Sequence, residues 1–573
     1  MRPRIHFGGS FQTSPGTGNN DDVLDRTGVV DTTSVTVHPP EGMADEDFRH
    51  WMEGLTGAAD PGRPGRLRAG WNYYGNNRCD FVDVAVTAVE PSDGPLVADA
   101  QADPLVGAQV TFGLAVMVDL DPKGFANTQI FADSLEVTLQ DGSHFGGERA
   151  WFHSRWLNRN RNLGVPGFGG ASAVFHGSIP EAALDWETGG SPALERFRQE
   201  VARGGGLTVR FCLYLLAPRL GEEALAEQYR AGKQVANPAV GRVVGTLGVW
   251  RSGELASVAL GRLLVPSGSM IGDKVPITLG PAVAEVDHEA HRVTLDLVST
   301  FPEVDASGAK AFLGEAVLRV RAGTGTSDIG PVPYDQAAYE RTAGLVEVPF
   351  DPALGPAVAA GELVLVTGQG GEMLVEAPVM AESDDRCLYL QEGESATVRF
   401  AALARGAPLA EPVRFLVVHH PGRGASLPVV ECPETVDVGA GADGGLTLKA
   451  ANPGCTVLRL ARSPGARQLD TARDPYVSVR VLPADDYAHV ADDQLTFGLV
   501  YQEVLRYYHL LHPAMSRVLD LSDERVMTAV AGTLLLRTDP AAWLGARYMP
   551  RTRDLSAGKR RLLERWCRKV SGT

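Results

Sequence analysis

Cysteine is scarce in this chain of 573 residues. The six cysteines are Cys79, Cys212, Cys387, Cys432, Cys455 and Cys567. They lie far apart, and none forms a Cys-x-x-Cys pair or a Cys/His group with the spacing of a zinc site. Since disulfides belong to oxidising compartments, we expect reduced thiols in a cytoplasmic protein.

Long hydrophobic runs and an excess of positive charge are also missing. No apolar stretch approaches the ~18 residues that a membrane-spanning helix needs, and the N-terminus has no hydrophobic signal region. The net charge of −17 argues against a surface for nucleic acids or anionic membranes. Because no nucleophile–base signature or phosphate loop is recognisable either, composition alone predicts no particular activity.

Glycine and proline are plentiful, with 65 and 37 residues, which suits a strand-rich chain with many turns. The length is too great for one hydrophobic core. We predict a mainly β, multidomain protein with four parts. These are a β-rich core domain over residues 1–275, a small β domain over 276–384, an immunoglobulin-like β-sandwich over 385–485 and a C-terminal helical unit over 486–573.

Helices are predicted where apolar residues recur every three or four positions. They span residues 44–55, 191–203, 222–231, 527–536 and 559–570, and a further helix is capped by Asp492 or Asp493. The second begins with Ser191-Pro192, a favourable N-cap followed by proline at the first helical position.

Residues 4–11 form a predicted strand in which apolar and polar residues mostly alternate. Gly8 and Gly9 interrupt it and indicate a bulge or a close approach of two backbones. His6 lies on this strand. It is either a buried, hydrogen-bonded histidine or a ligand or proton-transfer group.

Residues 150–163 have an unusual composition, with two tryptophans, three asparagines, three arginines and His153. Arg155, Arg159 and Arg161 share their parity with His153, so all four would lie on one face of a regular strand. Such a face suits the anchoring of a carboxylate, and the alternative is a polar hairpin.

Five short segments, spread over the chain, carry a resemblance to a known family. They are residues 3–7, 70–77, 247–264, 387–390 and 548–559. The closest match is Leu-Gly-Val-Trp-Arg-Ser-Gly-Glu-Leu-Ala-Ser at 247–257. The pattern resembles the haem-containing imine dimer synthases of the violacein, rebeccamycin and staurosporine pathways, also called chromopyrrolate synthase-like proteins. It corresponds to their front half, and their ferritin-like helical domain has no counterpart here.

The resemblance implies a haem-dependent oxidoreductase of natural-product biosynthesis. Members of the family bind haem b and oxidatively couple two imines of aromatic 2-oxo acids, which are small molecules derived from aromatic amino acids. A flavin amino-acid oxidase supplies the imine and hydrogen peroxide. The alternative is a non-catalytic scaffold, or a subunit that partners a separate ferritin-like protein.

Four residues are the predicted site. His6 is the preferred axial iron ligand because it lies in the matching N-terminal segment, and His153 is the second choice because arginines surround it. Arg155 or Arg161 is expected to bind a substrate carboxylate or a haem propionate, since a guanidinium forms two parallel hydrogen bonds to such a group. His153 would lie within reach of the same pocket.

Overall fold

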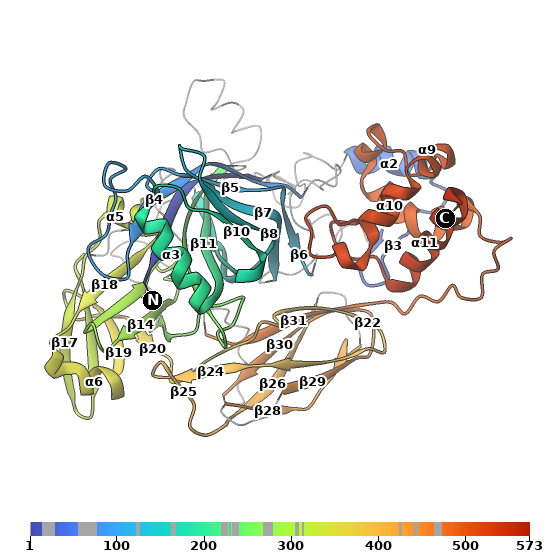
Figure 1. Cartoon of the computed structure of the whole chain (residues 1–573). Helices are drawn as coiled ribbons and strands as arrows, with labels where there is room; N and C mark the ends of the chain where they lie inside the picture. The colour runs from blue at the N-terminus through green and yellow to red at the C-terminus, as the bar shows by residue number, and fades with distance from the viewer. Residues whose placement is uncertain are drawn as a thin grey trace.

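The computed structural model describes residues 2–13, 29–54, 77–121, 127–161, 168–218, 227, 231, 240–267, 279–303, 309–311, 314–422, 427–439, 445–462 and 473–572. It confirms a mainly β, multidomain fold in which sheets precede a C-terminal helical unit (Figure 1). Residues 70–76 and, apart from 227 and 231, the predicted helix 222–231 lie outside the described ranges. Within those ranges, no helix has the length and apolar character needed to cross a membrane.

A ten-stranded antiparallel sheet forms the first body, with the order β10-β8-β9-β11-β12-β1-β4-β5-β7-β6. Its strands are β1 (Arg4–Thr13), β4 (Cys79–Glu90), β5 (Gln109–Phe112), β6 (Ala115–Asp119), β7 (Thr128–Thr138), β8 (His144–Arg161), β9 (Phe168–Pro180), β10 (Leu184–Glu187), β11 (Gly205–Pro218) and β12 (Val240–Arg251). Strand β7 also pairs with β8, so the sheet closes on itself. We call it the closed sheet.

The interior of the closed sheet is a core rich in phenylalanine. Gly245 of β12 makes room for this core, because a Cβ there would overlap the ring of Phe7. Gly9 fulfils the expected close approach of two backbones, since its Cβ would lie 2.6 Å from the carbonyl oxygen of Asp83 on β4. The β1–β4 register shifts at the same place. Helix α3 (Pro192–Gly204), capped by Ser191 as predicted, packs onto the core through its apolar face.

An eight-stranded sheet forms the second body, with the order β17-β16-β19-β20-β13-β14-β15-β18. Its elements are β13 (Arg262–Pro266), β14 (Ala282–Asp287), β15 (Arg292–Asp296), β16 (Ala316–Ala322), β17 (Gly325–Val332), β18 (Leu345–Pro349), β19 (Glu362–Thr367) and β20 (Glu372–Glu376), with helices α5 (Gln336–Arg341) and α6 (Gly355–Ala360). Because β13 pairs with β14 and β20, this sheet starts before residue 276, where the sequence placed the boundary.

Three smaller sheets over residues 380–482 share one apolar core and form a sandwich. Their strands are β21 (Met380–Glu382), β22 (Cys387–Gln391), β23 (Ser395–Arg399), β24 (Ala401–Ala404), β25 (Ala407–Pro408), β26 (Val413–Pro421), β27 (Val430–Glu431), β28 (Thr435–Val438), β29 (Gly445–Ala450), β30 (Gly454–Ala461) and β31 (Tyr476–Leu482). Strands β22 and β31 pair in parallel. Figure 1 shows the sandwich in orange below the closed sheet.

The C-terminal helical unit recruits a segment from near the N-terminus (Figure 1). Its helices are α7 (Phe497–Val500), α8 (Arg506–Leu511), α9 (Glu524–Ala529), α10 (Ala531–Thr538) and α11 (Ala557–Ser571), joined by α2 (Asp45–Gly54) and the strand pair β2 (Val30–Asp31) and β3 (Thr36–Val37). Phe48 and Met52 of α2 pack against Leu510 and Leu511. The cap predicted at Asp492 or Asp493 is wrong, because Thr496 caps the first helix through its side chain.

Candidate functional site

A row of buried polar side chains crosses the closed sheet from strand to strand. Each member lies directly opposite the next in the strand register. In order across β1, β12, β11, β9, β8 and β7 they are His6, Thr246, Arg210, His176, His153 and Gln129. All six are buried. We call them the polar row.

The polar row lies on the outer face of the closed sheet. Successive side chains on a strand point to opposite faces, and directly opposite residues share a face. The chain neighbours of the row, such as Phe7, Phe175 and Phe152, belong to the interior core. Polar side chains on the outer face are buried because the other bodies cover them: Arg210 binds Asp296 of the second sheet.

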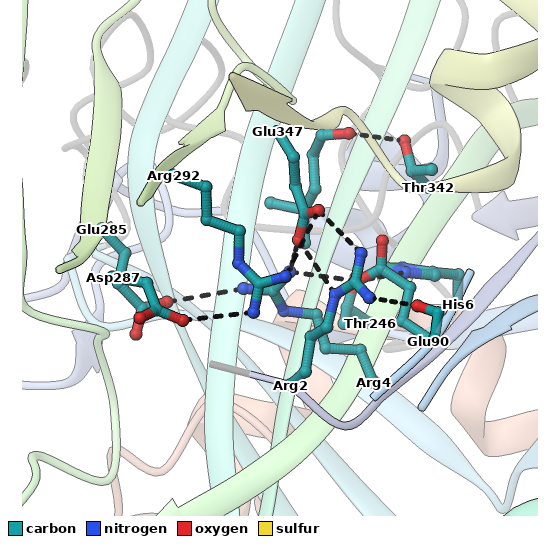
Figure 2. Close-up of polar contacts among 12 residues, drawn as sticks. Arg2, Arg4, His6, Glu90, Thr246, Glu285, Asp287, Arg292, Thr342 and Glu347 are labelled. Atoms are coloured by element: carbon teal, nitrogen blue, oxygen red, sulfur yellow. Dashed lines mark hydrogen bonds and ion pairs between the residues drawn. The ribbon is translucent and has the colours of Figure 1, made fainter. Parts of the chain in front are cut away.

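His6 lies at the end of the row that the second sheet covers (Figure 2). Its Nδ1 lies 3.1 Å from Oγ1 of Thr246, and its Nε2 lies 3.5 Å from Oε2 of Glu90. Burial lowers the pKa of His6, and this effect outweighs the opposing influence of Glu90. The ring is therefore neutral at neutral pH, and both of its nitrogens face groups of this chain.

Arginines and carboxylates surround His6 and join the two sheets (Figure 2). Arg4 lies 3.0 Å from Glu90 and 3.4 Å from Glu285, and Arg2 donates to Glu347 at 2.7 Å. Glu90 belongs to the closed sheet, whereas Glu285 and Glu347 belong to β14 and β18. This network gives the N-terminal strand a structural role at a domain interface.

His153 lies next to Gln129, which is the end of the row opposite to His6. It is 3% exposed, and its Nδ1 has no hydrogen-bond partner in the described structure. The ring of Trp151 packs against it with the centroids 4.1 Å apart. Burial, then the charges of Arg386 and His176, lower the pKa of His153 to about 3. It therefore offers a neutral imidazole with a free ring nitrogen, which is the form that binds iron.

Arg155 follows two residues later and is fully committed to partners within the chain. Its Nε donates to Oε1 of Glu382 at 2.7 Å, and its Nη2 donates to the carbonyl oxygen of Asp474 at 3.3 Å. The guanidinium also lies over the rings of Trp156 and Tyr476. The sequence predicts an external carboxylate at this arginine, and here the internal carboxylate of Glu382 occupies that place.

The sequence placed Arg161 on the same face as His153 by assuming a regular strand from 153 to 161. That assumption is wrong, because the strand is irregular after Arg155. Strand β8 pairs regularly with β9 from His153 to Arg155, but the register then shifts before Asn158 and again before Arg161. Trp156 sits at φ +54°, in the left-handed region, where the strand is bulged. Parity cannot be counted across such a bulge, and the side chain of Arg161 lies outside the described part of the structure.

The two predicted histidine ligands do not meet. Four strand-to-strand steps separate His6 from His153, which is about 19 Å measured along the curved sheet at the usual strand spacing of roughly 4.8 Å. Over the described ranges, no group of three or more His, Cys, Asp or Glu side chains could hold a metal ion. Only one of the two could therefore serve as axial ligand of a single haem.

Sequence reasoning missed His176 and Arg386. His176 lies opposite His153, and its Nε2 is 2.7 Å from Oγ1 of Thr208. Burial, then Arg210 and Arg386, lower its pKa to about 3. The sequence could have indicated a buried histidine at His176, because this residue follows the apolar pair Val174-Phe175. Arg386 comes from the sandwich, so only the tertiary structure brings it here.

Comparison with known proteins identifies two curated relatives. The 2-imino-3-(indol-3-yl)propanoate dimerase of Chromobacterium violaceum is 27% identical, and the alignment covers 100% of this chain and 58% of the relative. The dichlorochromopyrrolate synthase of Lentzea aerocolonigenes is 26% identical, with 98% and 55% covered. The chain thus spans somewhat more than half of the length of each. These similarities confirm the resemblance seen in the five short segments.

Other comparisons add no functional information. No profile of a known protein family matches the chain. Among solved structures, the N-terminal four immunoglobulin domains of Dscam1 isoform 4.44 align with 69% of this chain and 87% of their own, at 12% identity and a TM-score of 0.12. A score this low supports no argument about fold.

Proposed function

We propose that this chain acts in natural-product biosynthesis by oxidatively coupling two aromatic 2-imino acids into one dimer. The observation that carries the proposal is the similarity, over nearly the whole chain, to a dimerase of an indole-bearing 2-imino acid and to a dichlorochromopyrrolate synthase. A flavin amino-acid oxidase is the partner that would supply the imine and hydrogen peroxide.

The reaction balances with hydrogen peroxide as oxidant. Two enamine tautomers each lose one electron and one proton, and a carbon–carbon bond forms between the two radicals. Hydrogen peroxide takes up the two electrons and two protons and leaves as two water molecules. Holding both reactants in one site replaces a bimolecular encounter, which is worth up to roughly 7–11 kcal/mol in model systems.

Haem b would supply the one-electron oxidation when bound. Each histidine keeps one buried ring nitrogen without a hydrogen bond, Nδ1 of His153 and Nε2 of His6. We prefer His153 as the ligand of the haem, because Nε2 of His6 lies 3.5 Å from the carboxylate of Glu90. A carboxylate of substrate or haem would reach Arg155 only by displacing Glu382. Arg161 is the second arginine that the sequence predicts to bind such a carboxylate.

The visible spectrum of the purified chain tests this proposal. A haem protein shows an intense Soret band, and the loaded chain should convert indole-3-pyruvate, ammonia and hydrogen peroxide into a product of coupled mass. A chain that stays colourless after expression with added haem precursor, and that forms no dimer, contradicts the proposal. That result would favour a scaffold, or a subunit that partners a ferritin-like protein.

A further inference from the structure

A cavity of about 420 Å³ lies where the sandwich meets the C-terminal unit, and nothing above assigns it a role. Strand β22 forms one wall, at the end of the sandwich nearest the C-terminal unit in Figure 1. The lining includes Tyr389 of β22 and, from the C-terminal unit, Trp543, Tyr548, Arg553 and Arg560. The volume is in the range of small-molecule sites.

Arg553 is the chemically unusual member of this lining. It is 2% exposed, and four of its five N–H groups donate to the main-chain oxygens of Trp543, Arg551 and Gly545 at 2.8 to 3.3 Å. Its guanidinium carbon lies 3.4 Å from the ring centroid of Phe131. Over the described ranges, no carboxylate forms an ion pair with Arg553.

A buried cation without a counter-ion is unfavourable. Burial lowers the pKa of Arg553 to about 10, and the neighbouring ionisable groups that influence it are Tyr389, Tyr548 and Arg551. None of the three is a carboxylate. An anion that enters the cavity would therefore provide the missing charge, and a carboxylate could accept the one N–H group that Arg553 has left.

The aromatic residues beside Arg553 provide a surface for a ring. Tyr389 and Trp543 pack edge to face with centroids 5.2 Å apart. The Tyr389 hydroxyl accepts a hydrogen bond from Nε2 of Gln129 at 2.9 Å, which leaves its own proton for a ligand. Gln129 also accepts from Trp151 at 3.1 Å, and it lies opposite His153. The cavity is thus connected to the polar row.

The single carboxylate that lines the cavity does not neutralise Arg553. Oε2 of Glu394 accepts from the backbone N–H of Gln391 at 2.8 Å, at the turn that follows β22. Arg560 contributes a second cation, and its Nη1 lies 3.5 Å from Oε2 of Glu564 outside the lining. Among the lining residues themselves, two arginines stand against one carboxylate, and Arg553 is the cation that has no ion pair in the described ranges.

We propose that this cavity binds an aromatic carboxylic acid, with Arg553 holding the carboxylate and Tyr389 and Trp543 packing against the ring. Two of the five matching segments, residues 387–390 and 548–559, meet at this cavity. The identification of this ligand with the 2-imino acid that is coupled rests on the proposed function. The binding of an aromatic carboxylic acid in this cavity is independent of that function.

Isothermal titration calorimetry on the full chain with indole-3-propanoate, and with the neutral indole-3-propanamide, tests the site without haem or oxidant. The acid should bind saturably and at least about tenfold more tightly than the amide, since a charged hydrogen bond discriminates by that factor or more. Equal affinity for acid and amide, or no binding of the acid, overturns the proposal. This comparison needs no variant.

Two variants locate the binding. Arg553→Lys keeps the charge but removes the guanidinium, whose one remaining N–H group would donate to the acid, and it should weaken binding of the acid about tenfold. Arg547→Gln is the matched control, because Arg547 is exposed and binds Asp133 outside the cavity. Unchanged affinity in a folded Arg553→Lys variant overturns the assignment. If the chain binds the acid but couples no imino acids, the proposed function is wrong and this site stands. If the chain couples imino acids but does not bind the acid here, this site is wrong and the proposed function stands.

Discussion

His153 and His176 lie directly opposite each other on β8 and β9, both buried on the outer face of the closed sheet. Arginines face this pair from two directions, Arg210 from β11 and Arg386 from the sandwich. A proton on either imidazole would add a further positive charge beside these arginines in a buried interface. Both rings are therefore neutral, with pKa values lowered to about 3.

Acid should destabilise the haem-free chain well above the range in which carboxylates titrate. Below the ordinary histidine pKa of 6.5 the unfolded chain binds a proton at each position, whereas the folded chain does so only near pH 3. The free energy of unfolding therefore falls as pH falls through this window, by up to about 2 kcal/mol per histidine at pH 5. Urea unfolding between pH 7.5 and 5 measures the slope.

The control for this pH dependence is the double variant His153→Gln/His176→Gln, whose side chains cannot titrate. It should be less stable at pH 7.5 but show a flatter profile between pH 6.5 and 5. A profile as steep as that of the unsubstituted chain would assign the pH dependence to other groups.

The buried ion pair of Arg155 and Glu382 should be costly to break from one side. Glu382→Gln or Arg155→Met removes one partner of a buried ion pair, so we expect a loss of about 3 to 5 kcal/mol in the free energy of unfolding. Arg155→Met/Glu382→Leu should recover much of that loss. Arg414→Gln is the control, since its pair with Asp437 is exposed and worth less than about 1 kcal/mol.

If Arg155 or Arg161 instead binds a carboxylate of the substrate or of haem, substitution should change substrate affinity or haem content. Arg155→Lys and Arg161→Lys would then raise the apparent substrate constant or lower the haem content, by about 1 to 3 kcal/mol for a charged hydrogen bond. Wild-type values in both variants would mark these arginines as structural.

Truncation after Pro483 should lower the melting temperature by several degrees. It removes the helices that cover α2 and the contacts that Arg547 and Trp543 make with β7, including a 2.7 Å ion pair between Arg547 and Asp133. Calorimetry measures the shift, and hydrogen exchange should locate the loss of protection in α2. An unchanged melting temperature would show that the C-terminal unit is independent of the rest.

Haem content provides the test of ligand choice. His153→Ala should abolish or shift the Soret band, whereas His6→Ala should lower stability while leaving the band in place. The opposite result would restore His6 as ligand. An unchanged spectrum in both variants would exclude both histidines.

The sequence by itself determined the local structure. Alternating apolar residues predicted the strands, apolar residues three or four apart predicted α2, α3 and α11, and the Ser191-Pro192 start of α3 is observed as expected. These signals depend on neighbours a few positions away, which the chain supplies directly. They also placed His153 and Arg155 correctly on one face, because β8 is regular between them.

The tertiary structure alone decided what those side chains meet. The partners His176, Glu382 and Arg386 come from other strands and from another body, and strand register fixes them only after long-range pairing. The left-handed Trp156 breaks the parity that led to Arg161, and nothing local in the sequence announces this bulge. The cavity at Arg553 likewise exists only where the sandwich and the C-terminal unit pack together.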